Sequence, residues 1–300
     1  MPNARLLAIL FAVFGAAYFT MVYGGGDLGT KFSYRDSVAN TRHNLTQRQP
    51  GGGGPNGVIM DPYRNNYNEI CVYCHTPHGA NANVKAPLWN HTIKTTTYQT
   101  YNQLGTSTLT QTVSQPGPNS LTCLSCHDGQ VAVDSVINMP GSGLYDPNQA
   151  TSQSDAFLNT WPSASSVHGG LNPGQCLACH SAGAGFVGAG APDFTVAFIG
   201  TDLRNDHPVG ITYPIPVTGK DFNDPNQKKV GIAFFDTNGN GRADNNEIRL
   251  YDTGQGYKVE CASCHDPHGV PSAGPGSVFN ATFLRVSNAG SALCLTCHIK

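Results

Sequence analysis

Hydrophobic positions are unevenly spread along the 300 residues of the chain. Leu6 to Tyr23 form an uncharged, mostly apolar run, and no second apolar run of that length follows. Beyond it, 35 Gly and 20 Pro interrupt the sequence so often that neither a helical nor a strand period continues for long. We therefore expect a mostly irregular, coil-rich fold with short helices and few strands.

The apolar run has the flanks of an export signal. Arg5 precedes it, and Gly24 to Asp27 follow it. This order predicts a signal peptide over residues 1–23, and hence an exported protein that is extracellular or at the cell surface, otherwise periplasmic. A retained membrane anchor is the alternative, because the run reaches the lower length limit of a membrane span. Membrane contact is expected only in that case.

All ten cysteines fall in five copies of one pattern, C-x-x-C-H. An even cysteine count in an exported chain would favour disulfides, and paired C-x-x-C units could hold zinc. Neither alternative explains a histidine after every pair, whereas haem attachment does: both thiols bond the haem and the histidine binds its iron. The sequence predicts five covalently bound haem c groups. Their residues are Cys71, Cys74 and His75; Cys123, Cys126 and His127; Cys176, Cys179 and His180; Cys261, Cys264 and His265; and Cys294, Cys297 and His298.

Six histidines remain for the second axial position of five irons. Methionine is a poor alternative, because outside the signal region the chain has only Met60 and Met139. We therefore expect bis-histidine, low-potential haems. The predicted distal ligands are His43, His78, His168, His207 and His268, and His91 is the surplus residue. With every iron six-coordinate, the prediction is an electron carrier and not an enzyme.

Two of these ligands are constrained by spacing. His78 follows His75 by three residues in His-Thr-Pro-His-Gly, and His268 follows His265 likewise in His-Asp-Pro-His-Gly. Axial ligands approach one iron from opposite faces, so two histidines on the same side of the backbone cannot share it. His78 and His268 should therefore each serve a different, neighbouring haem.

Composition adds to this picture. Charged residues make up 12% of the chain and the net charge is −2, which gives no indication of nucleic-acid binding. Hydrophobic residues make up 39%, so haem is expected to supply part of the core. The chain divides into segments 24–150 with haems one and two, 151–200 with haem three, and 201–300 with haems four and five, which together form one structural unit.

The last segment contains a twelve-residue calcium-type loop. Its oxygen donors would be Asp236, Asn238, Asn240, the carbonyl of Arg242, Asp244 and Glu247, with Gly241 at the sixth position. Gly231 to Phe235 and Ile248 to Tyr251, which flank the loop, resemble strands and not EF-hand helices. The sequence favours bound Ca²⁺ over the alternative of a polar Asn/Gly turn.

Residues 40–130 and 200–300 resemble a known family. The resemblance rests on ICVYCHTPHGA, APLWN, CLSCHDG, DLRNDHPVG, VECASCHDPHG and CLTCHIK. These stretches are similar to the filament-forming outer-surface multihaem cytochromes of metal-reducing bacteria and some archaea. The resemblance implies a stacked chain of bis-histidine haems, head-to-tail homo-oligomers, and a distal histidine from a neighbouring subunit, for which His43 is the candidate. The closest members have four haems, so the third site departs from the pattern.

Long-range extracellular electron conduction is thus the favoured function, with redox proteins or extracellular acceptors as partners. The alternatives are a periplasmic or membrane-anchored electron-transfer subunit and a multihaem reductase. A reductase needs an open iron position, and the Lys-bearing attachment motif of pentahaem nitrite reductases does not occur.

Overall fold

The computed structural model describes residues 32–46, 67, 69–82, 84, 86–94, 96–138, 170–184, 193–215, 221–252 and 254–299. The expected signal segment 1–23 and His168 lie outside these residues. So do Met60 and Met139.

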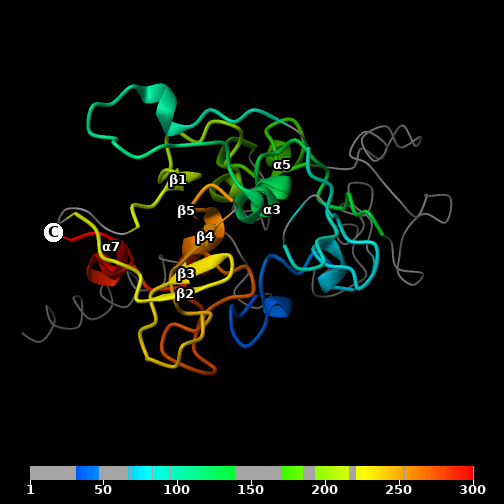
Figure 1. Cartoon of the computed structure of the whole chain (residues 1–300). Coiled ribbons are helices and arrows are strands. Elements are labelled where there is room, and N and C mark those ends of the chain that lie inside the picture. The colour runs from blue at the N-terminus through cyan, green and yellow to red at the C-terminus, as the bar shows by residue number, and fades with distance from the viewer. Residues whose placement is uncertain are drawn as a thin grey trace, which may run out of the picture.

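The helical elements are short, and five of them carry the attachment motifs (Figure 1). Those five are η3 (Cys71–Tyr73), α3 (Pro118–His127), α5 (Cys176–Cys179), α6 (Cys261–Cys264) and α7 (Ala292–Cys297). The other helical turns are η1 (Val38–Asn40), η4 (Tyr101–Leu104), η5 (Ala182–Ala184), η6 (Thr195–Ala197), η7 (Ala281–Phe283) and η8 (Ala289–Ser291). Every attachment motif is thus formed around a helical turn.

One small antiparallel sheet lies beside the last two motifs. Its strands are β1 (Ile211–Thr212), β2 (Gln227–Lys229), β3 (Ile232–Phe234), β4 (Arg249–Asp252) and β5 (Tyr257–Val259), in the order β1-β5-β4-β3-β2. Ala233 faces Leu250, and Tyr251 faces Lys258 across neighbouring strands. β3 and β4 confirm the strands expected on either side of the calcium-type loop.

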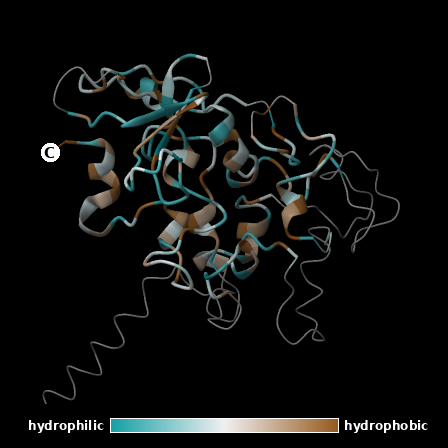
Figure 2. Cartoon of the chain, turned by 60° about the horizontal axis from the view of Figure 1, so that its bottom comes forward, coloured by the Kyte–Doolittle hydropathy of each residue, from teal (hydrophilic) through white to brown (hydrophobic). Residues whose placement is uncertain are grey.

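Buried side chains of the described residues gather in three separate clusters. The largest contains Tyr213, Ala233, Phe235, Ile248 and Leu250 on the sheet, with Cys264 and Cys297 packed against it. A second cluster surrounds Tyr73 and includes Cys74, and a third surrounds Leu124. Figure 2 shows hydrophobic residues spread over several short helices. Each cluster thus lies against an attachment motif.

None of the helices among the described residues has both the length and the apolar character that crossing a bilayer requires.

Candidate haem-attachment sites

Each C-x-x-C-H sequence forms one helical turn. In the first site, the amide of His75 donates to the carbonyl of Cys71 at 2.8 Å, which closes the turn. The same bond recurs at His180, His265 and His298, and the second site is contained in α3. Residues three and four apart share one side of a helical turn, so both thiols and the imidazole project together. All ten cysteines are free thiols.

Local sequence explains why the second and fourth turns are well formed. α3 begins after Gly117 with a proline at its first position, where the missing N–H costs no hydrogen bond. Glu260 is the N-cap of α6, and the side chains of Glu260 and Ser263 cap each other's backbone amides. The proline of α3 and the capping box of α6 thus define where each helix begins.

Most motif histidines direct Nδ1 at a backbone carbonyl. The bonds run from His75 to Pro87 at 2.9 Å, from His127 to Ala197 at 2.6 Å, and from His265 to Thr282 at 2.7 Å. Metal-binding histidines commonly use one ring nitrogen this way, which fixes the tautomer and leaves Nε2 for the metal. The three imidazoles therefore have the outer partner that an axial ligand requires.

His268 lies opposite His75. Their ring centres are 6.2 Å apart and their planes differ by 10°. A metal–nitrogen bond of about 2 Å on each side places two axial imidazole centres roughly 6 Å apart. Because His75 and His265 belong to different motifs, His268 and His265 face different sites, as their spacing requires.

A carboxylate holds His268 in place. Asp266 Oδ1 accepts from Nδ1 of His268 at 2.9 Å, and Asp266 Oδ2 accepts from the buried Arg285 at 3.1 Å. Hydrogen bonding with Asp266 raises the pKa of His268. Sequence reasoning did not single out Asp266 or Arg285. A sequence signal exists for Asp266: the matching position in the His-x-Pro-His-Gly unit of the first site is Thr76.

His43 faces His127 with the same separation but a different orientation. The ring centres are again 6.2 Å apart, and the planes cross at 80°. His43 also bonds the Pro267 carbonyl through Nδ1 at 3.1 Å and stacks on Phe283. Burial, followed by the nearby His127, lowers the pKa of His43 to about 4. Both conditions keep the ring neutral, which is the form that binds a metal.

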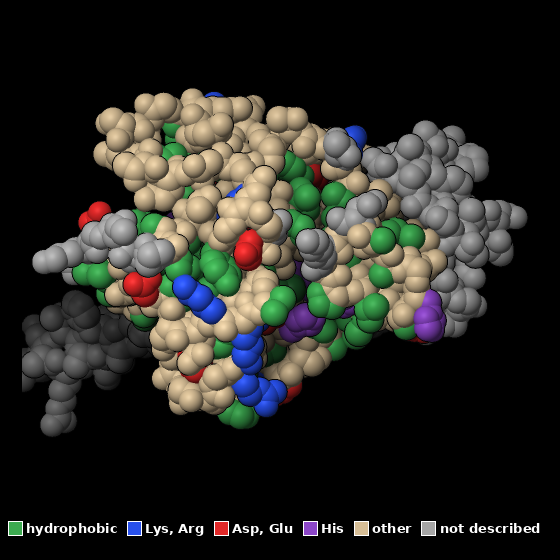
Figure 3. Space-filling model, viewed as in Figure 1, with side chains coloured by type: hydrophobic (Ala, Val, Ile, Leu, Met, Phe, Trp, Pro, Cys, Tyr) green, Lys and Arg blue, Asp and Glu red, His purple; other side chains and the backbone are tan. Residues whose placement is uncertain are grey.

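Two remaining predicted ligands, His78 and His207, and the surplus His91 lie in different surroundings. His78 is exposed, whereas both ring nitrogens of the fully buried His91 face carbonyls, those of Thr92 and Ala132. His207 is at the surface, where partial burial and then the nearby His298 lower its pKa. Figure 3 shows histidine side chains at two places on one face, one of them among hydrophobic side chains.

One orphaned donor fits a haem at the first site. The buried Trp89 lies 6.1 Å from His75, ring centre to ring centre, and its Nε1–H has no hydrogen-bond partner. A haem propionate is an acceptor of the kind this donor lacks. Paired thiols, an imidazole with free Nε2 and an unpaired donor therefore fit haem c.

The calcium-type loop is folded around its carboxylates. Asp236 accepts from the amides of Gly239 and Gly241 at 2.7 and 2.8 Å, and the fully buried Glu247 accepts from the amide of Thr237 at 2.7 Å. Asp244 accepts from the side chains of Asn238 and Asn240. The carbonyl of Arg242 has no described contact of this kind, although its amide donates to Asn240 at 2.7 Å. Across the described residues, no three His, Cys, Asp or Glu side chains are gathered at metal-binding distance.

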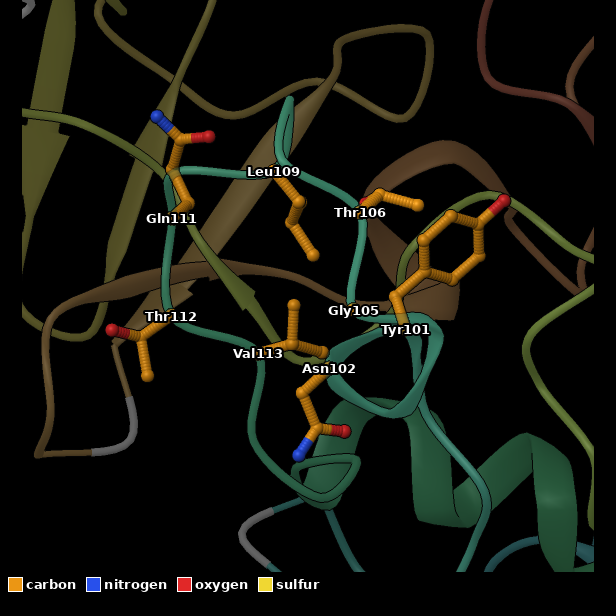
Figure 4. A pocket seen from close by; sticks show the side chains of 8 residues that line it. All are labelled: Tyr101, Asn102, Gly105, Thr106, Leu109, Gln111, Thr112 and Val113. Carbon is orange, nitrogen blue, oxygen red and sulfur yellow. The ribbon is translucent and has the colours of Figure 1, made fainter.

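A hollow lies apart from these features (Figure 4). Uncharged residues line it: Tyr101, Asn102, Gly105, Thr106, Leu109, Gln111, Thr112 and Val113. Tyr101 is the one residue of this lining whose type is used in general acid–base catalysis.

Comparisons with known proteins agree with the cysteine pattern. The family model described as a doubled CXXCH motif matches residues 255–300, which hold the fourth and fifth sites. Comparison with curated proteins gave no match. A doubled C-x-x-C-H motif with covalently bound haem c is typical of multihaem cytochromes that transfer electrons. The chain thus has the motif of a multihaem c-type cytochrome, an electron-transfer protein.

Proposed function

We propose that the chain is a pentahaem electron carrier and a subunit of an extracellular cytochrome filament. The observation that carries the proposal is the five helical turns, each presenting two free thiols and a histidine. Bound haem would supply one-electron transfer by its iron. The protein residues attach the haems, orient the axial imidazoles and set how closely the sites approach.

The histidine pairs support six-coordinate iron at two sites. His75 with His268 would hold the first haem, and His43 with His127 would hold the second. The proximity of His207 to His298 favours His207 for the fifth haem. His168 remains the candidate for the third, since it precedes that motif in the sequence.

Exposed His78 is the remaining distal candidate. Its own motif histidine, His75, faces His268. The inward placement of His43 against His127 of its own chain argues against a role for His43 in a neighbouring subunit. We therefore assign the intersubunit role to His78, with the haem of a second copy as its target.

Mass spectrometry and electron microscopy test this function. Mass spectrometry of the purified protein should show five haems per chain, and a bare polypeptide mass would contradict the assignment. Electron microscopy at high protein concentration should show head-to-tail filaments. Monomers alone would refute the filament and leave the electron carrier intact.

Export is part of the proposal. The N-terminal pattern up to Tyr23 supports secretion to the outside of the cell. N-terminal sequencing of native protein should begin beyond residue 23. An intact start would favour the membrane-anchored electron-transfer subunit.

Calcium would stiffen the loop before the fourth site. The buried carboxylates of Asp236 and Glu247 support the proposal, because their amide hydrogen bonds leave the negative charges unbalanced and a bound cation would balance them. Calorimetry should detect Ca²⁺ binding to the holoprotein and its loss in Glu247→Gln. Equal binding by both proteins would place the ion elsewhere.

A further inference from the structure

We infer that the first, second, fourth and fifth attachment sites form one continuous line, and that the third site is a side branch attached next to the second. This inference rests on the proposed function as an electron carrier. The attachment sites that are neighbours in space are therefore not always neighbours in the sequence. Each junction is carried by contacts between named residues.

The first and second sites meet through the segment after the first motif. The amide of Asn90 donates to the carbonyl of Cys74 at 2.9 Å. The adjacent His91 places Nε2 at 3.6 Å from the sulfur of Cys126. One short buried segment therefore spans both motifs.

The second and fourth sites are in direct contact, although the third motif lies between them in sequence. Helices α3 and α6 pack together. The Ser120 hydroxyl accepts from the amide of Cys261 at 2.8 Å and donates to Glu260. Glu260 also accepts from the amide of Gly117 at 3.0 Å.

These bonds make the second–fourth junction rigid. Ser120 is fully buried and Glu260 nearly so. Buried polar groups that are all satisfied hold their elements in one arrangement, because any displacement would leave a donor or acceptor unpaired. The helix starts of α3 and α6 are thus tied together at the residues that precede their first cysteines.

The fourth and fifth sites share one apolar cluster. Cys264 of α6 and Cys297 of α7 both pack against the sheet residues around Leu250. The sheet therefore serves as a common base for both motifs.

The third site contacts the rest of the described structure near the second site. Asn172 donates to the carbonyl of Gly129 at 2.8 Å, just past the second motif. Gly129 has φ +76°, and a Cβ there would lie 2.5 Å from the Leu171 carbonyl oxygen. The backbones of the second and third sites therefore lie very close together at this point. On the other side, the amide of Phe194 donates to the His180 carbonyl at 2.8 Å, and the ring of Phe194 stacks on that of His180.

The segment after Phe194 leads back to the second site. The Ala197 carbonyl bonds His127, and the amide of Ile199 donates to the His127 carbonyl at 2.8 Å. Figure 1 shows α5 beside α3, whereas α7 lies on the opposite side of the molecule. Cys179 is exposed. Among the described residues, the contacts of the third site thus converge on the second site, as expected of a branch that could serve as a lateral point for electron entry or exit.

Protein-film voltammetry of the holoprotein tests the branch. Cys176→Ser/Cys179→Ser removes the third haem, and Cys261→Ser/Cys264→Ser removes the fourth. Mass spectrometry first verifies that each variant carries one haem fewer. The third-site variant should lose a fifth of the charge per molecule at every scan rate. The fourth-site variant should lose a fifth at slow scans and more at fast scans, because its line is cut.

A variant without the fifth haem, which lies at the end of the line, is the control. It also keeps the test valid if the fourth-site variant fails to fold. Cys294→Ser/Cys297→Ser should also lose a fifth at every scan rate. A scan-rate-dependent loss in the third-site variant would place that haem within the line and overturn the branch. Failure of the electron-carrier function itself would look different, since the unaltered protein would then show no covalent haem and no electrode response.

Discussion

The two His-x-Pro-His-Gly units have nearly the same sequence and different surroundings. In the unit at the fourth site, the carboxylate of Asp266 bonds both His268 and Arg285. His268 faces His75 of the first site. In the unit at the first site, Thr76 occupies the position of Asp266 and donates to the His78 carbonyl at 2.9 Å. That leaves the His78 imidazole exposed without a carboxylate behind it. The repeat thus provides one histidine fixed inside the chain and one exposed at its surface.

Replacing the fixed ligand should have the largest effect. In His268→Ala, the first haem loses its distal imidazole, so one haem in five should become high-spin when oxidised. Low-temperature EPR and visible spectra of the holoprotein measure this. A fully low-spin spectrum would show that His268 is not an axial ligand.

Replacing the glycine that follows His268 or His78 should have the second-largest effect, and this effect should differ between the two units. Gly269 has φ +89°, and a Cβ there would lie 2.2 Å from the Phe279 ring. At Gly79, with φ +64°, the nearest atom is the side-chain amide of Asn138 at 2.6 Å. Gly269→Ala should cost about 1–3 kcal/mol more than Gly79→Ala, because a ring in a packed region yields less than an amide end. Denaturant unfolding measures both, and equal losses would mean that Phe279 moves freely.

Removing the carboxylate charge should have a smaller effect. Asp266→Asn weakens a charged hydrogen bond, which is worth about 1.5–3 kcal/mol. A less basic imidazole favours ferric iron less, so the potential of one haem should rise by about 60 mV for each tenfold change in that preference. Redox titration should show one haem shifted. A uniform shift of every haem would indicate a general structural change.

The smallest effect on the isolated chain is expected at His78. His78→Ala should leave the spin state of the monomer unchanged and its stability within about 0.5 kcal/mol, as at other exposed positions. The same variant should fail to form filaments. Normal filaments would remove His78 from the subunit contact.

Local signals made part of this arrangement predictable. The C-x-x-C-H turns and the strands beside the calcium-type loop depend on residues near one another in sequence, and the structure confirms those strands. The spacing of His265 and His268 also requires two different irons. Which iron His268 meets depends on the packing of the N-terminal part of the chain, so the sequence did not give this pairing.

Long-range contacts explain what could not be predicted. Arg285 supports His268 only through Asp266, and the contact between Arg285 and Asp266 forms only in the folded chain. His43 carried no local signal for His127, which belongs to another segment and is reached across Pro267. The contact of the second and fourth sites likewise needs Ser120 and Glu260, whose side chains meet through tertiary structure alone.

Low-temperature EPR of the fully oxidised holoprotein tests the paired histidines most directly. The planes of His75 and His268 differ by 10°, and those of His43 and His127 by 80°. Nearly parallel imidazoles give a rhombic low-spin signal, and crossed imidazoles give a strongly anisotropic one with a large maximum g value. Both low-spin signals should appear, with His268→Ala removing part of the first and His43→Ala removing part of the second. A predominantly high-spin spectrum of the unaltered protein would contradict the account.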